Sequence, residues 1–160
     1  MIRPYVEDDL KQLLEIYNFY VINTIITFDV EPLSLEVFAK KINKINNQYP
    51  FIVFEENKEV LGYAYGSKWR TKPAYNKTVE STVYVKHGEQ GKRIGTKLYT
   101  ELLSLLKQEN YHIVLGGLTL PNEASIRLHE RFNFKLVAHF KEVGKKFDKW
   151  LDVGFWQLKL

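Results

Sequence analysis

The chain has 160 residues, which suits one domain, and its hydrophobic content of 45% is that of an ordinary globular protein. The absence of cysteine excludes a disulfide framework, a cysteine-ligated zinc site and a cysteine nucleophile. The formal net charge is +4, and the basic residues concentrate at 86–97 and 141–149 without one long run, which favours a local phosphate site over nucleic-acid binding.

The first part of the chain predicts one short edge strand and two helices. The strand covers residues 2–6, and Asp8 and Asp9 then offer an N-cap for the first helix. That helix has apolar residues at helical spacing: Leu10, Leu13, Leu14 and Tyr17. An irregular connection is expected over 23–29. Ser34 begins the second helix, whose apolar face is formed by Leu35, Phe38, Ile42 and Ile45.

The middle of the chain predicts three strands. Residues 51–54 and 59–67 form two of them, joined by a hairpin turn at 56–58. A polar loop over 69–77 leads to the third strand, at 79–85. Because side chains alternate along a strand, one face of this third strand presents Glu80, Thr82 and Tyr84.

The last part of the chain predicts two helices and three strands. An amphipathic helix over 94–107 precedes a buried strand at 112–120. A helix then runs from Asn122 through Phe132, and Asn133 is suited to stop it in the left-handed conformation. Two strands, 134–143 and 146–158, follow around a turn at Gly144. The order βααβββαβαββ predicts an α/β domain with a mixed sheet.

The first motif is the loop Gln90-Gly-Lys-Arg-Ile-Gly-Thr, which joins the strand at 79–85 to a helix. Such a turn directs backbone N–H groups and a helix N-terminus at one point, which suits a phosphate. The loop has neither the Gly-x-x-x-x-Gly-Lys-Ser/Thr nor the Gly-x-Gly-x-x-Gly pattern. A tight strand-to-helix turn without a ligand is the structural alternative.

The second motif is a set of polar residues on the helix that follows Leu120-Pro121. Spacings of three and four place Asn122, Ser125 and His129 on one helix face. They predict either a solvated face with a structural histidine, or a polar wall that contacts a ligand.

These segments resemble the GCN5-related N-acetyltransferases (GNAT family), and within them the phosphinothricin and methionine sulfoximine acetyltransferases. The resemblance rests on ordered segments over nearly the whole chain: Val79-Glu-Ser-Thr-Val-Tyr-Val, Gly95-Thr-Lys-Leu-Tyr-Thr, Leu120-Pro-Asn, Ser125-Ile-Arg-Leu-His-Glu and Asp152-Val-Gly-Phe-Trp-Gln. It implies a single GNAT domain over 1–160, with about seven strands in a mixed sheet and about four helices. It also implies acetyl-CoA as the acetyl donor and no metal.

The resemblance further implies roles for individual residues. Glu80 matches the carboxylate that acts as base, and His129 lies near the departing thiol. The cofactor would be bound by Val83, Tyr84, Val85, Gly91, Lys92, Arg93, Ile94, Gly95, Thr96, Asn122 and Ser125. The acceptor would contact Phe28, Tyr65, Arg70, Lys72 and Tyr75.

Two positions depart from the family pattern. Arg93 replaces a loop glycine, although a residue with a Cβ disfavours a positive φ, and its guanidinium is suited to pair with a phosphate. Arg70 and Lys72 exchange the lysine and arginine of better-known members, which predicts a shifted acceptor preference.

The expected reaction is direct transfer of an acetyl group to the α-amine of a small amino acid or analogue: phosphinothricin, methionine sulfoximine or methionine sulfone. An α-amino group has a pKa of about 8, so a base with a raised pKa, here Glu80, is enough to deprotonate it. The alternatives are a GNAT enzyme for another amine, such as a protein N-terminus or a polyamine, and a non-catalytic CoA-binding module. The basic loop at 68–75 disfavours a polyamine.

The resemblance also implies a homodimer. Met1-Ile2-Arg3-Pro4 has no apolar signal region, and no stretch approaches the ~20 apolar residues of a membrane span. We therefore expect a cytoplasmic protein without membrane or nucleic-acid partners.

Overall fold

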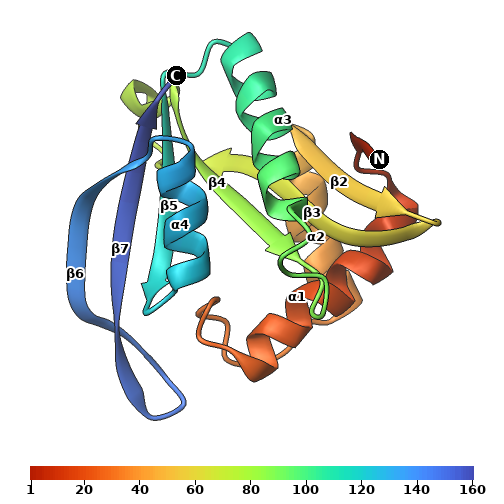
Figure 1. The fold of residues 1–160 in the computed structure, drawn as a ribbon, viewed down its shortest axis with the longest axis horizontal. Helices are drawn as coiled ribbons and strands as arrows, with labels where there is room; N and C mark the ends of the chain where they lie inside the picture. The colour runs from red at the N-terminus through yellow and green to blue at the C-terminus, as the bar shows by residue number, and fades with distance from the viewer.

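The computed structural model describes residues 1–160 and contains one seven-stranded mixed sheet with helices on both faces (Figure 1). The sheet order is β1–β2–β3–β4–β5–β7–β6. The strands are β1 (Ile2–Pro4), β2 (Phe51–Glu56), β3 (Glu59–Lys68), β4 (Thr78–Val85), β5 (Ile113–Leu120), β6 (Lys135–Lys146) and β7 (Lys149–Lys159). The helices are α1 (Leu10–Asn23), α2 (Leu35–Asn46), α3 (Ile94–Gln108) and α4 (Glu123–Arg131). This confirms the predicted fold class.

Two apolar clusters hold the helices to opposite faces of the sheet. One cluster packs α1 and α2 residues such as Leu13 and Phe38 against Val53 of β2. The other packs α3 residues such as Leu98 against Ile52, the neighbour of Val53. Side chains that alternate along one buried strand therefore supply both cores, as expected of a sheet covered on both faces. Leu35, expected on the apolar face of α2, is instead exposed.

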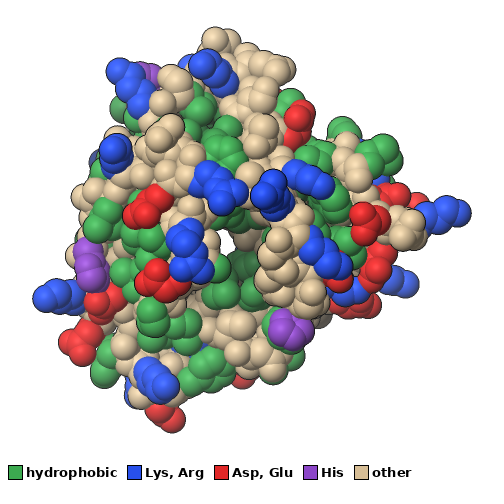
Figure 2. Space-filling model, in the orientation of Figure 1, with side chains coloured by type: hydrophobic (Ala, Val, Ile, Leu, Met, Phe, Trp, Pro, Cys, Tyr) green, Lys and Arg blue, Asp and Glu red, His purple; other side chains and the backbone are tan.

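A gap in the sheet separates the ends of β4 and β5, its only parallel pair. The two strands pair only at Thr78–Ile113, Val79–Val114 and Glu80–Leu115, and they diverge beyond these residues (Figure 1). Residues 81–85 keep their ladder to β3 but have no strand partner on the β5 side. In the space-filling view the molecule is hollowed near its centre, with Lys and Arg side chains along the rim of the opening (Figure 2).

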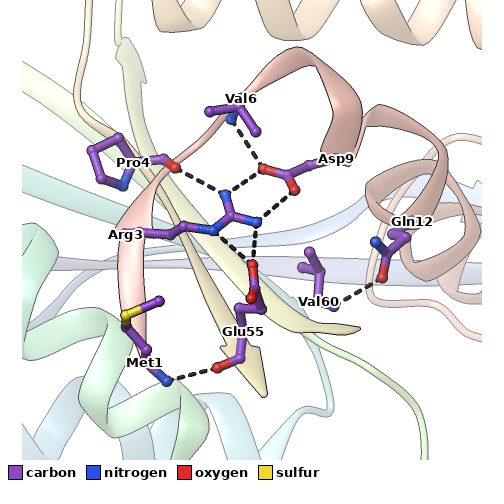
Figure 3. A network of polar contacts seen from close by, with 8 residues as sticks. All are labelled: Met1, Arg3, Pro4, Val6, Asp9, Gln12, Glu55 and Val60. Carbon is purple, nitrogen blue, oxygen red and sulfur yellow. Dashed lines mark hydrogen bonds and ion pairs between the residues drawn. The ribbon is translucent and has the colours of Figure 1, made fainter. Parts of the chain in front are cut away.

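An ion-pair network fixes the entry to α1 (Figure 3). Arg3 donates two hydrogen bonds of 2.8 Å to the Asp9 carboxylate and also binds Glu55 of β2. Although burial alone raises the pKa of Asp9, the bonds from Arg3 and the Val6 N–H lower it overall. The prediction that Asp8 or Asp9 caps the helix is wrong: the Asp9 side chain is already bonded to Arg3 and Val6, and a 3-10 turn, Glu7–Asp9, precedes α1.

The last hairpin turns later than predicted. β6 continues through Gly144, and the two-residue turn is Phe147–Asp148, with φ angles of 51° and 56°. The predicted turn at Gly144 is therefore wrong. This glycine serves a close approach instead, since a Cβ here would lie 2.2 Å from the Phe28 ring. None of the helices has the length and apolar character needed to cross a membrane.

Candidate functional site

The candidate active site is a cavity of about 290 Å³ at the point where β4 and β5 part. Its walls are residues 80–84 of β4 and 117–119 of β5, with Phe155 of β7 and the segment Ile26–Phe28 that follows α1. His129 and Tyr99 line it from the two helices on the other side of the sheet. The gap in the parallel pair thus opens a path from one face of the sheet to the other.

Glu80 is the only acidic residue that lines this cavity. Burial raises the pKa of its carboxyl group, and no cation pairs with it to counter that effect. The carboxylate lies against β5: a Cβ added to Gly117 would stand 3.1 Å from Glu80 Oε1 and 2.9 Å from the Phe155 ring. Glycine at 117 therefore leaves room for a reactant beside an unpaired carboxylate.

A buried chain of hydrogen bonds ends at His129. Its Nε2 lies 2.7 Å from the Tyr99 hydroxyl, which lies 2.9 Å from Ser81 Oγ, and its Nδ1 lies 2.8 Å from the Ser125 carbonyl. A carbonyl only accepts, so Nδ1 carries the proton of the neutral ring and Nε2 accepts from Tyr99. Burial lowers the pKa of His129, which favours this neutral form. The side chain is only 2% exposed.

Two further hollows extend the cavity into one channel. The first shares Val83, Tyr84, Asn122 and Ser125 with the cavity and is also lined by Val85. The second shares Val85 and Gly95 with the first, and reaches Gly91, Arg93 and Thr96 at the start of α3. The channel therefore joins the predicted base to the predicted phosphate loop. Lys92 lies outside its lining and pairs with Glu89.

The predicted phosphate loop contains residues in the left-handed conformation. Gly91 has a φ of 87°, and Arg93, immediately before α3, has a φ of 61°. Arg93 thus adopts a left-handed conformation despite its Cβ, at a cost of about 1 kcal/mol. Arg93 lines the same hollow as Arg127 and Arg131, which lie one turn apart on α4. Glu89 also lines this hollow and pairs with Lys92, so the three arginines leave the end of the channel with a net positive charge.

The residues expected to contact the acceptor divide into two groups. Phe28 lines the cavity, and the buried Tyr65 lies behind it, beside Thr82. Arg70, Lys72 and Tyr75 are exposed and do not line the cavity. Their loop is nevertheless at its edge, because the neighbouring Trp69 packs edge-on against Phe155.

Sequence reasoning missed Ser81, Tyr99 and Gly116. Tyr99 was detectable as a polar interruption in the apolar face of α3, and it is fully buried. Gly116 has no such signal in the sequence: a Cβ there would lie 2.3 Å from His129 Nε2, which only the fold reveals. The predicted polar wall of Asn122, Ser125 and His129 does line the cavity, and Asn122 also caps α4 through a 3.2 Å bond to the Ser125 N–H.

Comparison with known proteins shows which family the chain belongs to. Residues 2–154 match the model of the acetyltransferase (GNAT) domain. The chain belongs to the GNAT acetyltransferase family. Phosphinothricin N-acetyltransferase of Streptomyces coelicolor is 43% identical over 163 residues, covering 99% of this chain and 95% of the relative. The L-methionine sulfoximine/L-methionine sulfone acetyltransferase of Salmonella typhimurium is 36% identical, covering 95% and 90%.

A solved GNAT structure supports the same assignment. The phosphinothricin acetyltransferase of Sinorhizobium meliloti, in complex with acetyl-CoA, superposes with a TM-score of 0.96 at 32% identity, covering 100% of this chain and 88% of that one. The GNAT chain described here is thus an acyltransferase dependent on acetyl-CoA. Its channel fits such a donor, since one end is basic and the unpaired edge of β4 borders the middle.

Proposed function

We propose that this protein acetylates the α-amine of a small amino acid or analogue, of the phosphinothricin, methionine sulfoximine or methionine sulfone type, by direct transfer in a ternary complex. The observation on which the proposal rests is the lone, unpaired Glu80 in a small cavity that opens into a basic channel. The names of the relatives support the class of acceptor. The chain has no cysteine to be acylated on the way.

Glu80 is proposed to take the proton from the attacking amine. An α-ammonium group has a pKa of about 8, and burial moves the pKa of Glu80 up toward that value, which makes the proton transfer less unfavourable. When bound, acetyl-CoA supplies an acetyl group activated as a thioester. The unpaired edge of β4 at 83–85 offers backbone N–H groups to the negative charge that develops on an acyl oxygen.

His129 is proposed to act beside the departing thiol through Tyr99. The neutral imidazole accepts the Tyr99 hydrogen bond and so directs that hydroxyl, which lines the cavity. If the ring took up a proton at Nε2, the directions of these hydrogen bonds would reverse: Nε2 would donate to Tyr99, Tyr99 would donate to Ser81, and Ser81 would donate to the Leu115 carbonyl 3.3 Å away. His129→Phe should slow single-turnover acetylation; an unchanged rate would remove this role.

The cofactor is proposed to follow the channel. Its phosphates would face Arg93 and the N-terminus of α3, with Gly91, Gly95 and Thr96 around them. Arg127 and Arg131 add positive charge at the same end. The remaining predicted contacts of the donor are Val83, Tyr84, Val85, Lys92, Ile94, Asn122 and Ser125, of which Lys92 lies outside the lining of the channel.

The proposal is tested by an acetyl-CoA consumption screen over amino-acid analogues, polyamines and a peptide N-terminus, followed by kinetics of Glu80→Gln. We expect turnover of the small amino-acid analogues, and a loss of about 10²–10⁴-fold in kcat for the variant with the affinity for CoA kept. Glu101→Gln, at an exposed position of α3, is the matched control. Wild-type turnover by Glu80→Gln across pH would overturn the role of the base, and preference for a polyamine or peptide would overturn the acceptor class.

We further propose a cytoplasmic homodimer. Apolar side chains are exposed along the last hairpin, at Leu136, Val137, Phe140, Val143 and Trp150, and exposed apolar surface in this amount is typical of a subunit interface. A monomeric sedimentation profile would contradict the dimer. The absence of cysteine suits a reducing compartment.

A further inference from the structure

The strongest feature outside the catalytic groups is a buried lysine on the last hairpin. Lys146 is only 3% exposed, although lysine is almost never buried without a partner. Its ammonium group donates a 2.8 Å hydrogen bond to the backbone carbonyl of Thr27. No carboxylate lies within ion-pair distance; burial lowers its pKa and the charge of Asp29 raises it in part. The ring of Phe147 lies 5.1 Å from the same ammonium group, so the Thr27 carbonyl is its one hydrogen-bond acceptor.

That carbonyl belongs to the segment that covers the acceptor end of the cavity. Ile26, Thr27 and Phe28 all line the cavity, and none of them lies in a helix or strand. The Thr27 hydroxyl lies 3.0 Å from the hydroxyl of Tyr17 on α1. Thr27 is therefore held from one side by α1 and from the other by the hairpin.

A second contact joins the same two segments. The Phe28 ring packs on the backbone of Gly144, so closely that a Cβ there would lie 2.2 Å from it. Gly144 and Lys146 are two residues apart in β6 and therefore share one face of the strand. We call the pair of contacts, Lys146 with Thr27 and Gly144 with Phe28, the hairpin latch.

We propose that the hairpin latch positions residues 26–28 as the wall of the acceptor site, so that Lys146 is a positioning residue for acceptor binding. This inference rests on the proposed function, because it assumes that the cavity beside Glu80 receives the amine. The basic end of the channel has no part of the latch in its lining. Of residues 26–28 only Ile26, which makes neither latch contact, also lines the adjoining hollow, so the latch should affect the acceptor far more than the donor.

The test compares Lys146→Met with Lys145→Met. Lys145 is the neighbour on the opposite strand face, with a half-exposed side chain that pairs with Asp148, which makes it a matched control. We expect Lys146→Met to raise the KM for the acceptor at least tenfold, to leave the Kd for CoA by calorimetry within twofold, and to accelerate amide exchange in a peptide over 24–30. Lys145→Met should change none of these.

Gly144→Ala is measured in parallel, because it displaces Phe28 while Lys146 keeps its charge. Gly144→Ala should likewise raise the KM for the acceptor and leave the Kd for CoA unchanged. If Lys146→Met does not fold, Gly144→Ala alone tests the proposal. Unchanged acceptor KM and unchanged exchange at 24–30 in the folded variants would overturn the proposal, as would an equal loss of affinity for CoA. If the wild type acetylated no amino acid, the proposed function would fail while amide exchange would still report on the latch.

Discussion

Gly116→Ala should destabilise the fold through His129. The added Cβ would lie 2.3 Å from His129 Nε2 and 2.6 Å from Cδ2, well inside contact distance. The imidazole cannot swing away, because it packs between the rings of Tyr99 and Phe134 at centroid distances of 5.1 and 5.0 Å. Overpacking costs about 1–3 kcal/mol, and loss of the buried bond to Tyr99 adds about 1–3 kcal/mol.

The assay is urea and thermal unfolding followed by circular dichroism. A loss of about 4 kcal/mol, the middle of that range, lowers the Tm of a chain of this size by roughly 8–16 °C. Gly95→Ala is the control, because its Cβ meets only ordinary contacts at 3.5 and 3.7 Å and should change stability by less than ~1 kcal/mol. If Gly116→Ala unfolded at the same urea concentration as the wild type, the His129 ring would be free to move away from the added methyl group. Its hydrogen bonds to Tyr99 and Ser125 would then not be fixed, and they could not be used to assign its tautomer.

Three further predictions concern the channel and its charges. Gly117→Ala places a methyl group 3.1 Å from Glu80 Oε1 and should lower kcat/KM for the acceptor at least tenfold, with a smaller loss of Tm than Gly116→Ala; unchanged kinetics would contradict it. Burial raises the pKa of Glu80 in the folded state, so ionisation of this carboxyl group destabilises the fold as pH rises above its unfolded-state pKa. Glu80→Gln should therefore have a higher Tm than the wild type at pH 7.5, and the difference in Tm should disappear toward pH 4. Arg131→Ala should raise the KM for acetyl-CoA and weaken its dependence on salt, whereas an unaltered salt dependence would place the phosphates elsewhere.

Local patterns in the sequence were sufficient for most elements. Ser34 caps α2 through its bond to the Val37 N–H, and Asn133 ends the α4 segment with a φ of 64°, as their residue types predict. The turn after β2 also has the expected position, with Asn57 and Lys58 left-handed. These features depend on residues close in the chain, so they are visible in one sequence.

The errors arose where distant segments meet. Asp9 has the residue type of a cap, but Arg3 and Val6 occupy its carboxylate. Gly144 resembles a turn residue, but it is required by Phe28, more than a hundred residues earlier in the chain. The candidate site followed the same rule: motifs in the sequence indicated Glu80 and His129, which line one cavity, whereas the fit of His129 against Gly116 and of Lys146 against Thr27 depends on tertiary packing.

The divergence of β4 and β5 also has a thermodynamic consequence. A continuous sheet would pair the backbone groups of residues 81–85 with those of 116–120, whereas the split pair leaves most of these edges to solvent or to a ligand; the Val85 carbonyl accepts from the Tyr20 hydroxyl instead. A molecule that binds only the folded chain at these edges stabilises it, by about 2.7 kcal/mol at a hundred times its Kd. The melting temperature of this protein should therefore report the concentration of its acetyl donor, and protection of the amides at 81–85 should rise with it.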